Sequence, residues 1–221
     1  MMSTLVLTGA DYSVYTRIAR MALVQKGIDY RLDECDVFEE ADRAALGKRH
    51  PFGKIPVLDH AGKTVIETQA ILRYFDAVFP DKPLFPREAG DVARSEQAIS
   101  VVTNYAYPCL VWQIFVPWYR AMDEDPGKAG DGRPVDETVS KTALTCLDVL
   151  DRLIADTSWF SGRSFGAADS YVYAVLAYFR CVPWGLAACG GYPNLAAWFG
   201  LARNQPGPVA TPYPREARRA E

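Results

Sequence analysis

The chain has 221 residues, enough to bury a substantial core in one large domain or in two small ones. Hydrophobic residues make up 49% of it and charged residues 23%, which is typical of globular proteins and excludes a disordered chain. A formal net charge of −3 provides no general attraction to nucleic acid or to acidic lipid. Nucleic acid is therefore excluded as a partner.

Neither secretion nor membrane insertion is expected from the sequence. The first residues contain no basic segment followed by a long apolar run, and the richest apolar stretch, around residues 171–179, is too short to span a bilayer. The five cysteines are scattered and lack a C-x-x-C pair, which favours free thiols in a reducing cytoplasm over disulfides or a zinc site. Because His50 and His60 are the only histidines, no metal centre is expected.

Residues 1–80 are predicted to form a small α/β domain. Apolar residues that alternate with polar ones indicate strands, and apolar residues spaced by three or four indicate helices, the first of which should end at Gly27. Two short apolar runs separated by a glycine-containing turn predict a β-hairpin. The predicted elements are a strand at 5–8, a helix at 14–25, a strand around 30–32, a helix at 39–47, hairpin strands at 55–58 and 64–66, and a helix at 68–79.

Three prolines between residues 80 and 86 mark the predicted domain boundary, because proline disrupts both helices and strands. Residues 81–90 are assigned as a linker, residues 91–205 as an all-helical domain, and residues 206–221 as a poorly ordered tail. In the helical domain, Pro108 should kink or break the first long helix. The other helices are expected at 135–156, at 167–180, which is apolar nearly all round and should be buried, and after Pro193.

Three separated segments of the first domain carry polar residues either where a helix begins or where a proline precedes a strand. Ser13 precedes a helix, where unpaired N–H groups and the helix dipole favour negative charge, so its hydroxyl can stabilise a thiolate by hydrogen bonding. Taken alone, such a serine is more often a plain helix N-cap. The segments are S-V-Y-T-R-I-A-R-M-A-L at 13–23, H-P-F-G-K-I-P-V-L at 50–58 and E-T-Q-A-I-L-R-Y-F at 67–75.

In their order and spacing, these segments resemble the glutathione transferase superfamily. The first is similar to the catalytic loop of its serine-type cytosolic classes, the second to a segment that ends in a cis-proline, and the third to the pattern E-S-x-A-I-x-x-Y-L. The resemblance implies a thioredoxin-like α/β N-terminal domain followed by an all-α helical bundle domain. It also implies glutathione as co-substrate, a small hydrophobic electrophile as second substrate, a homodimer and a role in detoxification.

The resemblance assigns glutathione binding to residues of the second and third segments. The Ile55 backbone, beside a cis-proline, pairs with the peptide like an added strand. The helix start at Thr68 holds one carboxylate, Glu67 meets the ammonium, and Lys54 meets the other carboxylate. Each residue also has an ordinary structural interpretation, as a trans-proline strand entry, an N-cap or a solvated charge. The complete assigned set is His50, Lys54, Ile55, Pro56, Glu67 and Thr68.

Ser13 is not the only candidate for activating the thiol. Lowering a thiol pKa by two units takes about 2.7 kcal/mol, which a helix terminus and a charge-assisted hydrogen bond supply together. Tyr12 and Tyr15 flank this serine, and tyrosine has the role in other classes of the family, so both stay candidates. The partner of the glycine carboxylate of glutathione stays open, because Glu39 and Glu40 stand where relatives often have basic residues.

The second domain supplies candidates for the electrophile pocket. Six aromatic residues lie along the helix that lines this pocket in relatives, but they cannot all face one way, and most should be bundle core. Tyr105, Trp112 and Tyr119 are the candidate pocket residues. Further on, F-G-A-A-D at 165–169 resembles the family's capping box, with Gly166 replacing serine or threonine. The overlapping G-x-S-x-G is rejected as a hydrolase nucleophile, because no strand precedes it and no histidine follows.

Three functions remain open from the sequence alone. The leading hypothesis is a glutathione transferase, which ionises the thiol of glutathione and adds it to an electrophile. The second is a glutathione-dependent disulfide reductase or peroxidase. Its mixed-disulfide version is disfavoured because serine stands where such relatives carry cysteine, whereas a version that uses two glutathiones stays open. The third is a non-catalytic protein that binds glutathione or another ligand, since fold does not fix function.

Overall fold

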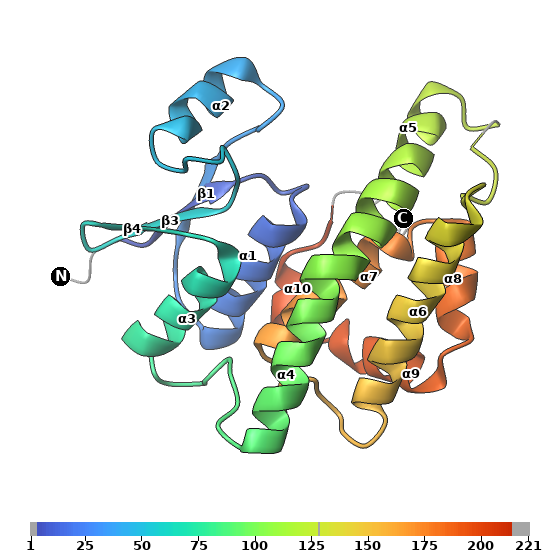
Figure 1. Cartoon of the computed structure of the whole chain (residues 1–221). Helices are drawn as coiled ribbons and strands as arrows, with labels where there is room; N and C mark the ends of the chain where they lie inside the picture. Colours follow the sequence, from blue (N-terminus) through green and yellow to red (C-terminus); the bar gives the residue numbers. More distant parts are fainter. Residues whose placement is uncertain (1–3, 128, 214–221) are drawn as a thin grey trace.

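The first third of the chain folds around a four-stranded sheet, in a computed structural model that describes residues 4–127 and 129–213. The strand order is β2-β1-β3-β4, with β1 parallel to β2 and antiparallel to β3 (Figure 1). Helices α1 and α3 contact each other on one side of the sheet, and α2 lies on the other. The bounds are β1 Val6–Gly9, α1 Val14–Lys26, β2 Arg31–Glu34, α2 Glu40–Gly47, β3 Val57–His60, β4 Lys63–Ile66 and α3 Thr68–Val78.

The order of elements predicted for this domain is confirmed, and its turns follow from local residues. Gly27 ends α1 in the left-handed conformation, with φ of 71°. Ala61 and Gly62 both have positive φ, at 51° and 74°, as a two-residue turn between antiparallel strands requires. The loop of the hairpin is therefore shorter than predicted, because the strands extend until only these two residues lie between them.

A buried ion pair attaches the proline-rich segment to this domain. The ammonium of Lys26, at the end of α1, lies 2.7 Å from the Asp76 carboxylate on α3 and also donates to the carbonyls of Asp81 and Lys82. Asp76 in turn accepts from the Leu84 amide at 2.9 Å. The segment between the domains is thus held by charge-assisted hydrogen bonds, although it has neither helix nor strand.

One continuous helix of 36 residues, Ala89–Glu124, opens the second domain. It consists of α4 (Ala89–Val101), a π-helical stretch η1 (Val102–Phe115) and α5 (Val116–Glu124). Pro108 was predicted to kink or break this helix; the helix does not break there, and the chain around Pro108 is π-helical instead. Proline lacks an N–H and clashes with the carbonyl four residues earlier, and the wider π-helix, which bonds at a spacing of five, accommodates it.

By length and composition alone, this helix could cross a membrane, which the sequence analysis did not foresee. An 18-residue window of it reaches a mean hydropathy of 1.3, and 44% of that window is buried in the fold. The helix packs against α6 (Glu137–Ile154) and α7 (Ala167–Phe179). The core helix of a helical domain passes the same test, so this is weak evidence for a membrane span.

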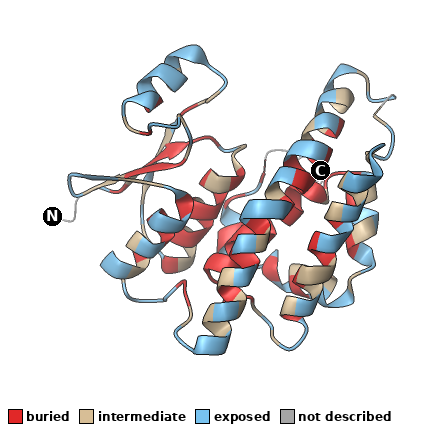
Figure 2. Cartoon of the chain, in the orientation of Figure 1, coloured by how far each residue is buried: buried red, intermediate tan, exposed pale blue. Residues whose placement is uncertain are grey.

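Helix α7 is the buried centre of the second domain. Every one of its residues is buried, as its sequence, which is apolar nearly all round, predicts (Figure 2). It contacts η1 and α4 on its own side and α1 of the first domain on the other. The buried residues of the two domains therefore form one continuous core, and α7 contacts helices of both domains.

The last part of the chain contains two helices that the sequence analysis missed, α8 (Pro183–Gly190) and α10 (Pro206–Ala210), alongside the predicted α9 (Pro193–Ala202). Both are short and begin with proline, so they carry little periodic signal. The expectation of a poorly ordered tail is wrong for residues 206–213, since α10 packs on α1 and Tyr213 is buried. Residues 214–221 lie outside the described residues. Helix α6 also starts later than predicted and leaves Val135 fully exposed.

The buried carboxylate of Asp169 fixes the start of α7. It accepts hydrogen bonds from the Phe160, Ser161 and Gly166 amides and from the Trp198 indole, at 2.9–3.1 Å. The bond from the Gly166 amide is the Asp169 half of the predicted capping box, and glycine has no side chain to supply the other half. Gly166 is required for a reason the sequence did not reveal, because a Cβ there would lie 2.3 Å from the carbonyl oxygen of Leu84.

We expect Gly166→Ser to destabilise the protein, although serine is the better N-cap by sequence rules. The clash with a backbone carbonyl should cost about 1–3 kcal/mol of unfolding free energy, more than the few tenths that an N-cap serine gains. Urea unfolding measures the difference. Gly90→Ser is the matched control, since a Cβ at Gly90 meets nothing within 4 Å. Equal stability of both variants would contradict this explanation.

Candidate functional site

Ser13 caps the N-terminus of α1, where the chain leaves β1. Its φ and ψ of −81° and 123° are extended, and its Oγ accepts a hydrogen bond from the Thr16 amide at 3.2 Å. A hydroxyl that accepts in this way keeps its proton for donation to another group. The first turn of α1 contains no acidic residue, so the positive end of the helix dipole is not neutralised there. The position suits an anion that accepts a hydrogen bond from Ser13.

Tyr12 is held at both its side chain and its backbone. Its hydroxyl donates to Asp36 Oδ1 at 2.6 Å, and its carbonyl accepts a hydrogen bond from the Tyr178 hydroxyl on α7. Burial and the hydrogen bond to the Asp36 carboxylate raise the pKa of Tyr12 well above its ordinary value. The surroundings of this hydroxyl therefore disfavour a second negative charge.

Tyr15 lies at the junction of the two domains. Its ring packs edge-on against Tyr107 of η1 and Tyr171 of α7, with ring centroids 4.7 and 6.2 Å away. Burial raises the pKa of Tyr15 to about 12, and the nearby Glu67 carboxylate adds to the rise. Of the three candidates for stabilising a thiolate, Ser13 is the one at the N-cap of a helix, where the local field favours an anion.

The second motif presents a short length of unpaired backbone. The Ile55–Pro56 peptide bond is cis, as the resemblance implies. Pro56 is buried and Ile55 half-buried, just before β3 begins. Among the described residues, neither the amide nor the carbonyl of Ile55 has a hydrogen-bond partner. A peptide can therefore pair with this backbone, next to the exposed Lys54.

The third motif leaves the N-terminus of α3 open. Glu67 precedes the helix with φ of 69°, a conformation that is costly for a residue other than glycine, and its side chain does not cap the helix. The following Thr68 is buried at the first helical position. The amides of this first turn thus have no side-chain cap and remain able to bind a carboxylate.

His50 lies behind Glu67 and not at the surface. It is 1% exposed, and its Nδ1 accepts a hydrogen bond from the Phe52 amide at 3.2 Å. This bond assigns the proton of the neutral ring to Nε2, which lies 3.8 Å from Glu67 Oε1. The carboxyl group of Glu67 faces outward, with 67% of its side chain exposed. His50 is therefore too buried to contact a ligand directly and would act on one only by way of Glu67.

Basic side chains are scarce where a second carboxylate of a ligand would need one. The first turn of α2 carries Glu40 and Asp42, which repel an anion. Arg49, which the sequence analysis did not consider, is already bound to Thr8 Oγ1 and to the Asp59 carboxylate. Lys54 stays the predicted partner of that carboxylate.

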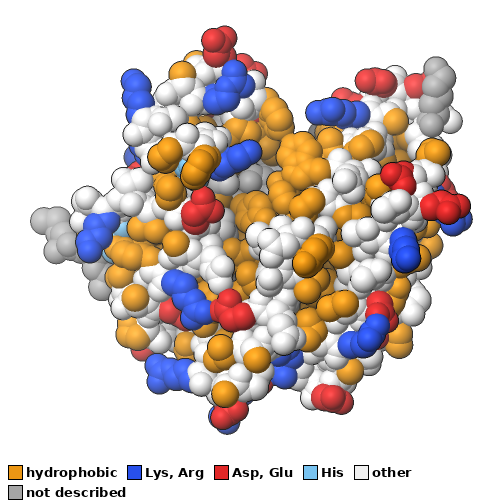
Figure 3. Space-filling view, viewed as in Figure 1, with side chains coloured by type: hydrophobic (Ala, Val, Ile, Leu, Met, Phe, Trp, Pro, Cys, Tyr) orange, Lys and Arg blue, Asp and Glu red, His pale blue; other side chains and the backbone are white. Residues whose placement is uncertain are grey.

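An apolar hollow separates the first domain from α5, and hydrophobic side chains gather in it (Figure 3). Trp112 is 46% exposed and contacts Tyr107, which in turn contacts Tyr15 in the first turn of α1. The sequence analysis had not singled out Tyr107 for the pocket. It stands five residues before Trp112, a spacing that shares a face in a π-helix but not in the α-helix that the analysis assumed.

The other two predicted pocket residues, Tyr105 and Tyr119, lie on η1 and α5. Tyr119 packs against the buried Phe115, with ring centroids 5.6 Å apart. Tyr105 is 59% exposed and lies two residues before Tyr107, so the two side chains point to different sides of the helix. The assignments of Tyr105, Trp112 and Tyr119 to an electrophile pocket stay predictions, and Tyr107 is the residue that connects Trp112 to Tyr15.

The cysteines do not provide a reactive thiol. All five are buried, and burial raises the pKa of Cys35, the one at the end of β2, with a further contribution from Asp42. The described residues contain no cluster of three or more His, Cys, Asp or Glu side chains that could hold a metal ion. The chemistry of this chain is therefore not centred on its own thiols.

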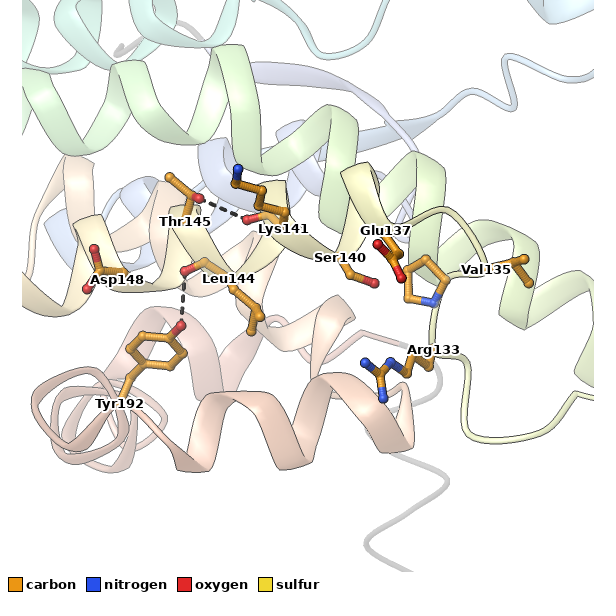
Figure 4. A pocket seen from close by; sticks show the side chains of 10 residues that line it. Arg133, Val135, Glu137, Ser140, Lys141, Leu144, Thr145, Asp148 and Tyr192 are labelled. Atoms are coloured by element: carbon orange, nitrogen blue, oxygen red, sulfur yellow. Dashed lines mark hydrogen bonds between the residues drawn. The ribbon is translucent and has the colours of Figure 1, made fainter.

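A large pocket lies elsewhere, on the outer side of α6. It has a volume of about 690 Å³, and Figure 4 shows Arg133, Lys141 and Leu144 along it. Across the pocket, the Tyr192 hydroxyl donates to the Leu144 carbonyl at 3.0 Å. The pocket contains no residue of the three motifs, and its lining mixes charges of both signs. We do not assign the reaction to it.

Known proteins match this chain over both domains. A family model of the glutathione S-transferase N-terminal domain matches residues 7–83, and one of the C-terminal domain matches residues 135–200. A probable glutathione S-transferase from Solanum tuberosum is 27% identical over 201 residues, covering 89% of this chain and 85% of that protein.

Solved structures show the same fold. Glutathione transferase F7 from Populus trichocarpa has a TM-score of 0.74 at 20% identity, covering 94% of this chain and 97% of its own. A glutathione S-transferase from Methylobacterium radiotolerans, in complex with glutathione sulfonate, has a TM-score of 0.74 at 23% identity, covering 94% of each chain. The fold is thus a thioredoxin-like domain followed by a helical domain, as the resemblance implies. Because the two family models together match more than half of the residues, the chain belongs to the glutathione transferase superfamily and is a glutathione transferase.

Proposed function

We propose that this enzyme ionises the thiol of bound glutathione at Ser13 and adds the thiolate to a small hydrophobic electrophile. The observation that carries the proposal is the geometry of Ser13, whose Oγ accepts from the Thr16 amide and keeps its proton at the open N-terminus of α1. The thiol proton passes to solvent as the thiolate forms. The sulfur then forms a bond to the electrophilic carbon, which releases a leaving group or takes up a proton.

Glutathione fits the remaining groups because it is a peptide with one ammonium and two carboxylates. We place its backbone along the unpaired Ile55, its ammonium at Glu67, and the neighbouring carboxylate at the amides of α3 beside Thr68. Lys54 takes the glycine carboxylate. The relative from Methylobacterium radiotolerans supports this ligand class, since its structure holds glutathione sulfonate.

The hollow between the domains supplies the second site. We place the electrophile against Tyr107 and Trp112, whose rings contact each other and, through Tyr107, the ring of Tyr15, because an apolar or aromatic electrophile would gain favourable ring contacts there. The buried thiols give no support to a mixed-disulfide reductase. A homodimer and a cytoplasmic location stay part of the proposal, on the basis of the family resemblance and the scattered free cysteines.

Ser13→Ala should remove the shift in thiol pKa. With glutathione saturating, kcat rises with pH as the bound thiol ionises, because only the thiolate attacks. We expect the wild-type midpoint about two pH units below the ordinary thiol pKa of about 8.5, and the variant midpoint close to that ordinary value. The measurement is kcat against pH with a chloronitrobenzene. Tyr15→Phe is the control and should keep the wild-type midpoint, whereas a midpoint that moves only in Tyr15→Phe would transfer the role to that tyrosine.

Glu67→Gln should weaken glutathione binding without changing the chemistry. Loss of one charged partner of the ammonium should raise KM for glutathione about tenfold, with kcat little changed at saturation. A glutathione analogue that lacks the α-amino group tests the contact directly, since wild type and variant should bind it equally. A tenfold difference that persists with the analogue would show that Glu67 does not bind the ammonium.

A further inference from the structure

We propose that Tyr178, on the buried helix α7 of the second domain, is a positioning residue for Ser13. The inference rests on the proposed role of Ser13 in ionising the thiol. Its basis is the hydrogen bond from the Tyr178 hydroxyl to the carbonyl of Tyr12, which joins residues 166 positions apart in the sequence.

The peptide group between Tyr12 and Ser13 is held at both of its ends. Its carbonyl accepts from Tyr178, and its amide, which belongs to Ser13, donates to the Ala10 carbonyl at 3.1 Å. A peptide group is planar, so two bonds on opposite sides fix its rotation. That rotation sets the direction of the Cα–Cβ bond of Ser13, and with it the place of Oγ above the start of α1.

The packing around Tyr178 leaves its hydroxyl little freedom. The side chain is 3% exposed, near the C-terminal end of α7. Its ring lies 4.0 Å from the ring of Tyr213, which follows α10, and 5.1 Å from the ring of Phe115 on η1. Tyr213 and Phe115 also contact each other, at 5.8 Å. Three aromatic rings from distant parts of the chain thus aim one hydroxyl at the catalytic loop.

The other side of the loop is fixed independently. The Tyr12 hydroxyl is bound to Asp36, so loss of the Tyr178 bond would free the peptide carbonyl while the Tyr12 side chain stays in place. Glutathione binding depends on different elements, the backbone before β3 and the start of α3. Removal of the Tyr178 hydroxyl should therefore impair ionisation of the thiol and leave the affinity for glutathione nearly unchanged.

Tyr178→Phe tests the inference, with Tyr192→Phe as the matched control. Tyr192 also donates its hydroxyl to a backbone carbonyl, that of Leu144, on the remote side of the helical domain. We expect Tyr178→Phe to raise the pKa of bound glutathione toward its free value and to lower kcat at neutral pH about tenfold, since small displacements of a catalytic group are costly. KM for glutathione and Tm should change no more than in Tyr192→Phe.

A second comparison separates this inference from the proposed function. In the Ser13→Ala background, Tyr178→Phe should have no further effect on the thiol pKa, because it acts through Ser13. If Ser13→Ala shifts the thiol pKa and Tyr178→Phe does not, the positioning role is overturned and the function of Ser13 stands. If neither variant shifts it, both are overturned. Equal effects of Tyr178→Phe and Tyr192→Phe on all readouts would show that the bond from Tyr178 to Tyr12 has only a structural role.

Discussion

The buried carboxylate of Asp169 is the constraint on which the rest of the structure depends. A charge inside a protein core is tolerated only where hydrogen bonds replace water, and four donors from the loop before α7 and from α9 do so here. They fix where α7 begins and how it is oriented. Since α7 packs against η1 and α4 on one side and against α1 on the other, its placement determines how the two domains meet.

The candidate site lies at this junction and draws on both sides of it. The first domain supplies open backbone, in the amides at the starts of α1 and α3 and in the unpaired Ile55. Such groups bind anions and peptides without a basic side chain. The first turn of α2, which is acidic, supplies no basic side chain for this purpose. The second domain supplies aromatic surface at Tyr107 and Trp112. In the proposed function, the first domain would bind the polar ligand and the second the apolar one.

Sequence reasoning was successful where the signal is local. The helix that Ser13 caps, the hairpin turn and the nearly all-apolar α7 follow from residues close together in the chain, and each is confirmed. It failed where distant segments meet. The clash that requires Gly166 comes from the Leu84 carbonyl, and the bond to Tyr12 comes from Tyr178. Tyr107 was missed because its face of the helix depends on π-helical spacing, which has no recognised pattern in sequence.

Ultraviolet titration of the thiolate in the binary complex with glutathione tests the central claim most directly, because it needs no electrophile and reports the bound sulfur itself. Absorbance is followed across pH for the wild type and for Ser13→Ala, each saturated with glutathione. The account predicts a wild-type midpoint about two units below the ordinary thiol value of about 8.5, and loss of that shift in the variant. A wild-type complex that binds glutathione but ionises near 8.5 would contradict it and indicate a ligand-binding protein on this fold.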